Sequence, residues 1–204
     1  MTLTAEGIHV WRGSRHVLRG LSFAVAAGEA VHVAGPNGTG KTTLLRVLAG
    51  LLAPEQGSVR WGGRAIVEDR DAYSGSLSYL GHDNALKADL SALENLEFAT
   101  GLRRELQAGE AGAALERVGI ARCADLPARA LSAGQRRRLA LARVVLALTP
   151  LWLLDEPFTN LDADGTALLA GVVAGHVAAG GLVLLAAHQL PELPVRSLRR
   201  LELA

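Results

Sequence analysis

The sequence predicts an α/β fold: a parallel sheet covered by helices, with an antiparallel β edge near the N-terminus and a helical insert in the middle of the chain. Three observations support this prediction. Apolar runs of strand length stand at 30–34, 151–154 and 182–187. The segment 163–179 has a helical composition and leads into the last of these runs, as a parallel sheet requires. A glycine-rich loop joins the first run to another helix.

Length and composition limit the possible classes of protein. The chain has 204 residues, so we expect one domain, residues 1–204, with a helical subdomain over approximately 83–145. A chain of this size buries about 70% of its unfolded surface and needs no disulfide. The single cysteine, Cys123, agrees with a reducing compartment. The net charge of +1 argues against a dominant nucleic-acid surface, so nucleic acid is not expected as a partner.

The first third of the chain is expected to be rich in β-strands. Strands are predicted at Leu3–Trp11, Ser22–Ala26 and Ser58–Trp61, with turns at Gly28-Glu29 and Gly62-Gly63. A last short strand is predicted near Leu198–Leu203.

The middle of the chain is expected to be helical. Ser91 with Glu94 three residues later forms a capping box that opens a helix over Ala92–Arg104. Ser132 is predicted to cap a second helix over Gly134–Leu148, whose inward residues are Leu139, Leu141, Ala142, Val145 and Leu146.

Residues 167–187 are long and apolar enough to resemble a membrane span, and contain one ionisable residue, His176. Alanine and glycine fill much of this stretch, and Gly180-Gly181 divides it. A helix followed by a buried strand explains the pattern better. We therefore expect the chain to reach a membrane only through a partner.

The most specific motif is the octapeptide G-P-N-G-T-G-K-T, which fills the pattern G-x-x-x-x-G-K-[ST]. In such loops the backbone N–H groups surround a nucleotide's phosphates at the start of a helix. The lysine reaches the β- and γ-phosphates, and the following hydroxyl binds Mg²⁺. The predicted nucleotide-binding residues are Gly35, Pro36, Asn37, Gly38, Thr39, Gly40, Lys41, Thr42 and Thr43, with Thr42 also a metal ligand.

Two carboxylates end the apolar run L-W-L-L, where ligands bind in parallel α/β sheets. Asp155 is placed to hold Mg²⁺ through water, and Glu156 to orient and deprotonate the water that attacks the γ-phosphate. A polar turn after a strand is the simpler alternative for this pair in isolation.

Residues Leu131, Ser132, Ala133, Gly134 and Gln135 present a hydroxyl and a bare backbone at the start of a helix, which is a second candidate anion site. One chain does not need two γ-phosphate sites for one nucleotide, whereas two chains facing head to tail would each close the other's site. An ordinary helix cap is the alternative.

Taken together, these motifs resemble those of ABC transporter nucleotide-binding subunits. The matching pieces are G-P-N-G-T-G-K-T at 35–42, L-S-A-G-Q at 131–135, L-W-L-L-D-E-P at 151–157, T-N-L-D at 159–162 and A-A-H-Q at 186–189. The resemblance implies a P-loop NTPase with a RecA-like core, and a dimer that encloses two ATP molecules. It implies that Ser132 and Gly134 contact the other chain's ATP, that Asp162 links the two sites, and that His188 contacts the γ-phosphate.

Two further positions follow from the resemblance. Trp11 lies where such subunits carry an aromatic ring that stacks on adenine; a strand aromatic that covers the core is the alternative. His82 stands where the family usually has a glutamine that reaches the metal and the attacking water. A histidine is shorter and titrates near neutrality, so the usual metal contact is in doubt here. Ala133 replaces a commoner glycine.

Residues 79–96 are similar to one subgroup, the ATP-binding subunits of heme exporters in cytochrome c maturation. This resemblance implies an ATP-hydrolysing subunit with ATP and Mg²⁺, peripheral on the cytoplasmic face of the bacterial inner membrane. The implied partners are a second copy, multi-span permease subunits and, indirectly, a heme chaperone. An iron–sulfur assembly ATPase, an exporter of another cargo and a non-catalytic subunit remain as alternatives.

Overall fold

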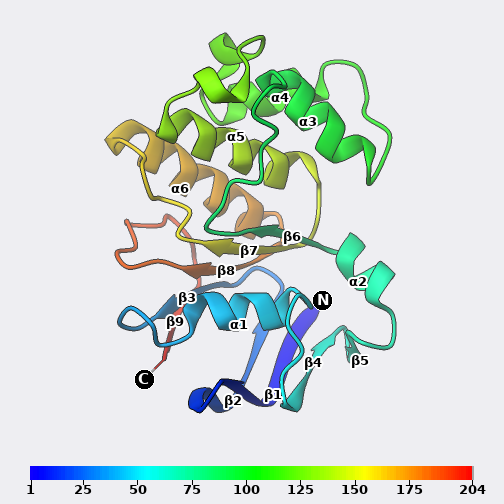
Figure 1. The fold of residues 1–204 in the computed structure, drawn as a ribbon, viewed down its shortest axis with the longest axis vertical. Coiled ribbons are helices and arrows are strands. Elements are labelled where there is room, and N and C mark those ends of the chain that lie inside the picture. Colours follow the sequence, from blue (N-terminus) through cyan, green and yellow to red (C-terminus); the bar gives the residue numbers. More distant parts are fainter. Residues whose placement is uncertain (204) are drawn as a thin grey trace.

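The computed structural model describes residues 1–203 and contains a five-stranded parallel sheet (Figure 1). Its order is β6-β7-β8-β3-β9. The strands are β6 (Leu77–Leu80), β7 (Leu151–Asp155), β8 (Leu182–Ala186), β3 (Ala30–Ala34) and β9 (Leu198–Glu202). The apolar runs predicted as strands are confirmed, and all of their pairings are parallel.

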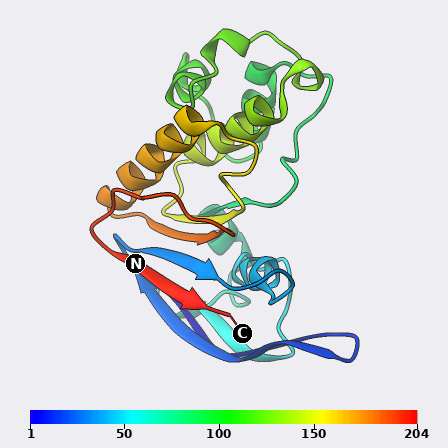
Figure 2. The ribbon, with the colours of Figure 1, turned by 90° about the vertical axis from the view of Figure 1, so that its left-hand side faces the viewer.

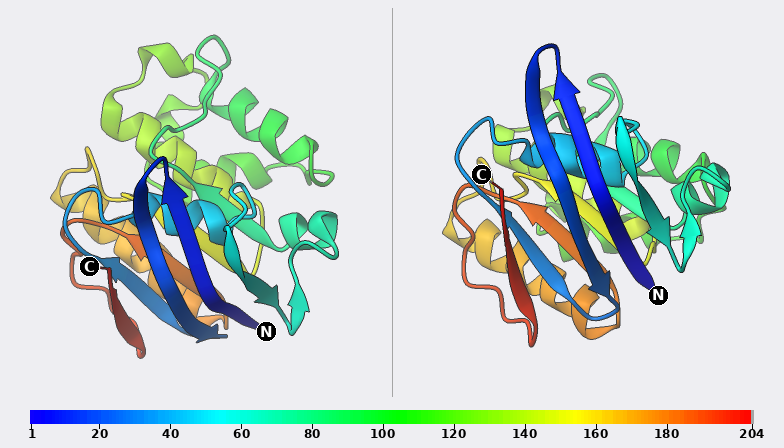
Figure 3. Two further views of the ribbon diagram at one scale, coloured as in Figure 1. Left: turned by 60° about the horizontal axis from the view of Figure 1, so that its bottom comes forward. Right: turned by 90° about the horizontal axis from the view of Figure 1, so that it is seen from below.

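The N-terminal strands form the predicted antiparallel part of the fold, as a second sheet that is separate from the parallel one. Its order is β2-β1-β4-β5. The strands are β1 (Thr2–Arg12), β2 (Arg15–Ala26), β4 (Gln56–Trp61) and β5 (Arg64–Ala65). A tight turn joins β1 to β2, and β1 pairs with β2 on one side and with β4 on the other. Within residues 1–203, none of these strands pairs with a strand of the parallel sheet. Seen from below, they cover α1 (Figure 3).

Helix α1 (Lys41–Leu48) lies between the two sheets (Figure 1). Side chains of β7 alternate between two apolar clusters, because successive residues of a strand face opposite ways. Leu151 and Leu153 pack with α1 and the antiparallel sheet, whereas Trp152 and Leu154 face the remaining helices. The nucleotide motifs at the strand ends are therefore held by a sheet that is buried on both faces.

The remaining helices lie on the other face of the parallel sheet (Figure 2). They are α3 (Ala92–Gly101), α4 (Glu110–Arg117), α5 (Ala133–Leu146) and α6 (Ala163–Ala178), with 3₁₀ turns η1 (Ala121–Cys123) and η2 (Ala128–Ala130). Both predicted caps are present, and Ser91 and Ser132 each form a full capping box. The predicted inward residues of α5 are all buried. A short helix, α2 (Arg70–Gly75), was not predicted.

The apolar stretch 167–187 divides into α6 and β8, as predicted. Within residues 1–203, no helix is long and apolar enough to cross a membrane. His176 on α6 stacks on Trp152 of β7, with ring centroids 3.8 Å apart and planes 7° apart. The one ionisable residue of this stretch is therefore a packing residue of the core.

Candidate nucleotide site

The glycine-rich loop leaves the start of α1 open. Gly40 is the N-cap of α1, with a φ of 104° in the left-handed region and no side chain to accept a bond from the first helical N–H groups. A Cβ on Gly40 would lie 2.6 Å from Cγ1 of Val17. The loop thus holds a conformation that favours glycine, and its N–H groups are available to an anion.

Lys41 is nearly buried, and its Nζ donates to the carbonyl oxygens of Gly35 and Pro36 at 2.7 and 3.1 Å. The lysine is thereby held over the loop that it would serve. From the β1–β2 hairpin, Arg15 donates through Nη2 to the carbonyl of Gly38 at 2.9 Å. Two cations therefore stand beside the loop before any phosphate binds.

Asp155 ends β7 and is 2% exposed, and its Oδ2 is a buried oxygen without a hydrogen-bond partner. Burial raises the pKa of Asp155, while the neighbouring Thr42 side chain opposes the rise. An unpartnered carboxylate oxygen beside a hydroxyl is a donor set that suits Mg²⁺. The two residues predicted as metal ligands thus come together.

Glu156 has a φ of 49°, which is unusual for a residue with a side chain. Its Oε2 accepts a hydrogen bond from the backbone N–H of His188 at 3.3 Å. The strand ends that carry Glu156 and His188 are therefore adjacent. His188 itself has an exposed side chain, and the carbonyl before it, on Ala187, lies 2.9 Å from Nε2 of His32.

A cavity of about 440 Å³ is lined by residues of the phosphate loop, of the β1–β2 hairpin and of the end of β7, and His188 is not among its lining residues. His82, the second residue after β6, lines it together with Asp155 and Glu156. The other lining residues are Asn37, Gly38, Gly40, Lys41, Thr42 and Thr43 of the loop and α1, and Arg12, Arg15 and Val17 of the hairpin. Three motifs that are distant in the sequence therefore face one space.

Trp11 is not among the residues that line this cavity. Its ring stacks on His16, with centroids 3.9 Å apart and planes 7° apart, and His9 lies 5.6 Å away. Neighbouring residues of a strand point to opposite faces, which is why Arg12 rather than Trp11 lines the cavity. The structure thus covers one face of the Trp11 ring with a side chain of the same hairpin.

The segment 131–135 lies at a separate hollow, which shares no lining residue with the first cavity. Ser132 accepts from the N–H of Gln135, and the Gln135 side chain accepts in return from the N–H of Ser132. A Cβ on Gly134 would lie 2.7 Å from the carbonyl oxygen of Asn160, so the two segments touch. Asp162 joins them as well, because it accepts from Nη2 of Arg138 at 2.6 Å.

Comparison with known proteins decides the family. A family model described as "ABC transporter" matches residues 18–159. The chain belongs to the ABC transporter family. This match shows that the chain is a nucleotide-binding ATPase subunit, and the cavity is the candidate site for the nucleotide.

Curated relatives cover almost the whole chain. It is 45% identical to the cytochrome c biogenesis ATP-binding export protein CcmA of Dechloromonas aromatica, over 98% of this chain and 99% of that protein. It is 49% identical to the protein of that name from Paramagnetospirillum magneticum, over 92% and 88%. A third such relative, from Haemophilus influenzae, is 43% identical over 99% and 95%.

Solved structures give the same ABC transporter fold at lower identity. An ATP-binding subunit of an ABC transporter superposes with a TM-score of 0.84 over 92% of this chain and 80% of that chain, at 24% identity. A putative ABC transporter ATP-binding protein from Pyrococcus furiosus gives 0.85 over 100% and 98%, also at 24% identity. The predicted fold class is confirmed.

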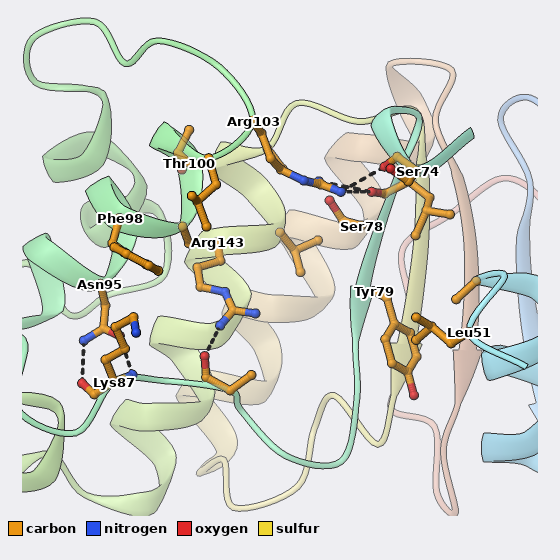
Figure 4. A pocket seen from close by; sticks show the side chains of 17 residues that line it. Leu51, Ser74, Ser78, Tyr79, Lys87, Asn95, Phe98, Thr100, Arg103 and Arg143 are labelled. Atoms are coloured by element: carbon orange, nitrogen blue, oxygen red, sulfur yellow. Dashed lines mark hydrogen bonds between the residues drawn. The ribbon is translucent and has the colours of Figure 1, made fainter. Parts of the chain in front are cut away.

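A groove of about 460 Å³ lies between α3, β6 and α5 of this ABC transporter subunit (Figure 4). Leu51, Phe98 and Leu102 line it, and each is a large apolar residue at least 48% exposed. Arg103 borders it and donates to the carbonyls of Ser74 and Leu77. No surface role was predicted from the sequence for Leu51, Phe98 or Leu102.

Two arginines of α5 were also missed by the sequence analysis, which gave them no role. Arg137 is 3% exposed and donates to the backbone beside Asp155 and Glu156. Arg143 donates to the carbonyls of Asn84 and Ala85. A sequence signal existed, because Arg137 precedes the inward residues Leu141 and Val144 by four and seven positions, on one helix face.

Proposed function

We propose that the protein hydrolyses ATP for a membrane exporter that delivers heme, or releases a heme-loaded chaperone, in c-type cytochrome biogenesis. The assignment of heme as the cargo is supported by the sequence identity of 43–49% to cytochrome c biogenesis ATP-binding export proteins, over nearly the whole chain. In this proposal the chain is peripheral on the cytoplasmic face of the bacterial inner membrane.

The phosphate chain of ATP would lie along residues 35–43. The open N-terminus of α1 supports this role, because uncapped N–H groups and the helix dipole attract an anion. Lys41 would exchange its loop carbonyls for phosphate oxygens. Thr42 and Asp155 would hold Mg²⁺, which would neutralise charge on the phosphates when bound.

Glu156 would be the general base toward water, with His188 beside it as the second group that contacts the γ-phosphate. The hydrogen bond from the His188 N–H supports this arrangement, because it holds the carboxylate at the mouth of the cavity. His82 would take the place of the usual glutamine, and its position on the cavity lining supports that role.

A second copy of the chain would complete each site. The separate hollow at 131–135 supports this, since Ser132 and Gly134 line a space that the chain's own phosphate loop does not reach. Asp162 would link the two sites, and its ion pair with Arg138 ties it to the same helix as the signature. Closure around two ATP molecules and opening after hydrolysis would be the two-state element.

The partner in the membrane would dock on the groove of Figure 4. Its exposed Leu51, Phe98 and Leu102 suit an apolar cytoplasmic segment of a multi-span permease. In this proposal residues 1–204 act as one domain, and the helical subdomain over approximately 83–145 moves with the partner.

Hydrolysis is tested with Glu156→Gln in the full chain, co-purified with the membrane proteins that it binds. We expect turnover to fall at least about 100-fold, since a positioned base contributes about 10²–10⁴-fold. ATP affinity should stay within threefold. Turnover unchanged in this variant would remove Glu156 from its role.

The cargo is tested in the source organism by replacing the native chain with Glu156→Gln and staining its periplasmic proteins for covalent heme. We expect holocytochrome c to be lost and iron–sulfur enzymes to remain active. The opposite pattern, or co-purification with a soluble scaffold only, would favour the iron–sulfur alternative. Normal levels of holocytochrome c together with normal iron–sulfur enzyme activity would favour an exporter of another cargo.

A further inference from the structure

Arg137 of α5 uses all five N–H groups of its guanidinium on two segments that carry lining residues of the cavity, His82 in one and Asp155 and Glu156 in the other. Nη1 donates to the carbonyl of Gly81 and to Oδ1 of Asn84, both at 3.0 Å. Nη2 donates to the carbonyls of Asp155 and Glu156, the second at 2.8 Å, and Nε donates to Pro157 at 3.4 Å. An arginine has five N–H groups, so none is left for a phosphate or a water.

The hydrogen-bond acceptors of Arg137 belong to two segments that both reach the nucleotide cavity. One, 81–84, contains His82, and the other, 155–157, contains Glu156. Four of the five acceptors are backbone carbonyls, so Arg137 sets the path of the chain and not the charge of a side chain. It lies 3% exposed behind the cavity and is not among its lining residues.

The backbone that Arg137 holds is in an unfavourable conformation. Glu156 has a φ of 49°, and Nη2 of Arg137 donates to the carbonyls on both sides of its α-carbon. A second residue with a side chain and a positive φ, Ala85 at 50°, accepts a hydrogen bond on its carbonyl from Arg143 of the same helix. Such strain persists only where surrounding contacts impose it.

We infer that Arg137 is a positioning residue for hydrolysis, which fixes Glu156 and His82 relative to each other and to the helix that begins at Ser132. It rests on the proposed role of Glu156 as the base. Because Arg143 reaches the same segment from the docking groove, a movement of α5 or of 84–85 is transmitted through Arg137 to the carboxylate. None of the hydrogen-bond acceptors of this side chain belongs to the phosphate loop, so we expect ATP binding to be independent of it.

The test compares Arg137→Gln and Arg137→Lys with Arg117→Gln, an exposed arginine on α4, in the full chain with its co-purified membrane partners. We expect kcat to fall at least tenfold for Arg137→Gln and less for Arg137→Lys, which keeps the charge but offers at most three donors. The dissociation constant for ATP, measured by calorimetry in EDTA, should stay within threefold. Arg117→Gln should match the unmodified chain.

Amide hydrogen exchange of the nucleotide-free full chain gives a readout independent of turnover. In Arg137→Gln we expect faster exchange in both 81–85 and 155–157, with 35–43 unchanged, whereas a general loss of stability would speed all three. The inference is overturned if kcat is unchanged, or if kcat and ATP affinity fall together. If Arg137→Gln does not fold, Arg137→Lys and Asn84→Ala decide by the same criteria. Failure of Glu156→Gln to slow turnover would instead count against the base itself.

Discussion

Two helix N-termini in this molecule carry motifs that the sequence analysis proposed as anion sites, and the two ends differ in how they are capped. At α1 the N-cap is Gly40, which has no side chain to accept a hydrogen bond. At α5 the N-cap is Ser132, which forms a complete capping box with Gln135. The first end has unmet donors and a lysine beside them, whereas the second is already satisfied.

This difference in capping explains why the N-terminus of α1 would bind phosphate within a single chain. The N-terminus of α5 would contact phosphate only when a second chain supplies the nucleotide. An uncapped helix end gains from an anion what a cap would otherwise supply. A capped end gains less, so Ser132 would contribute to a nucleotide that is already held by another copy. Affinity would reside at α1, and closure of the dimer would depend on α5.

A side chain at Gly40, the N-cap of α1, should have the largest effect on ATP binding. In Gly40→Ala, a Cβ would meet Val17 at 2.6 Å and a φ of 104° would be strained. We expect ATP affinity, measured by calorimetry, to fall at least about 100-fold, which corresponds to about 2.7 kcal/mol. Gly171→Ala on α6 is the matched control, because its added Cβ meets no atom within 4 Å. Retained affinity in Gly40→Ala would mean that the loop does not hold the phosphates.

Changing the capped end should leave affinity intact and prevent dimer closure. Aspartate caps a helix as well as serine does, so Ser132→Asp keeps α5 stable while its charge repels a triphosphate. With Glu156→Gln in the background to stop turnover, we expect ATP affinity within threefold but at least tenfold weaker ATP-dependent dimerisation by light scattering.

Ser91→Asp is the control for this change, because Ser91 forms the same capping box on α3. It should leave dimerisation unchanged. Equal dimerisation in Ser132→Asp and Ser91→Asp would contradict a role for α5 in the interface.

The two ends also differ in a nearby carboxyl group: the pKa of Asp155 is raised and the pKa of Asp162 is lowered. This difference predicts a third, smaller effect, on the thermal stability of the chain. Burial raises the pKa of Asp155, so the folded chain binds more protons than the unfolded chain, and stability falls as pH rises from the ordinary carboxyl pKa to the raised one. Asp155→Asn should therefore raise the Tm of the nucleotide-free chain at pH 7, by about 2–4 °C after allowance for solvent screening.

Asp162 is the counterpart at the capped end. The Gly165 N–H and the Arg138 guanidinium lower its pKa, so its stabilisation is present above the ordinary carboxyl pKa and is lost as pH falls through the lowered one. Because Asp162 also caps α6, Asp162→Ala should lower the Tm at pH 7, and by less at acidic pH where the carboxyl is protonated in both states. A lower Tm at pH 7 in Asp155→Asn would contradict the cost assigned to its buried charge.

The parts of this comparison that could be predicted are those encoded within a few residues. The capping boxes at Ser91 and Ser132 depend on a partner three positions away, and the phosphate loop is one continuous motif. The acceptors of Arg137 lie 56 and 18 residues away and are mainly carbonyls, which every residue has. The separation of β1, β2 and β4 into their own sheet likewise depends on pairings that local sequence does not specify.

The smallest expected effect concerns the base of the nucleotide at the open end. If adenine stacks on Trp11, it uses the ring face that His16 leaves free, or it displaces His16. An exposed stack is worth about 1 kcal/mol, so Trp11→Ala should weaken ATP binding about fivefold and leave inorganic tripolyphosphate binding unchanged. His16→Ala, which frees the second face, should not weaken ATP binding. If Trp11→Ala weakened the binding of ATP and of tripolyphosphate equally, the ring would support the hairpin and its Arg15 rather than stack on adenine. The phosphates alone would then account for the affinity at the N-terminus of α1.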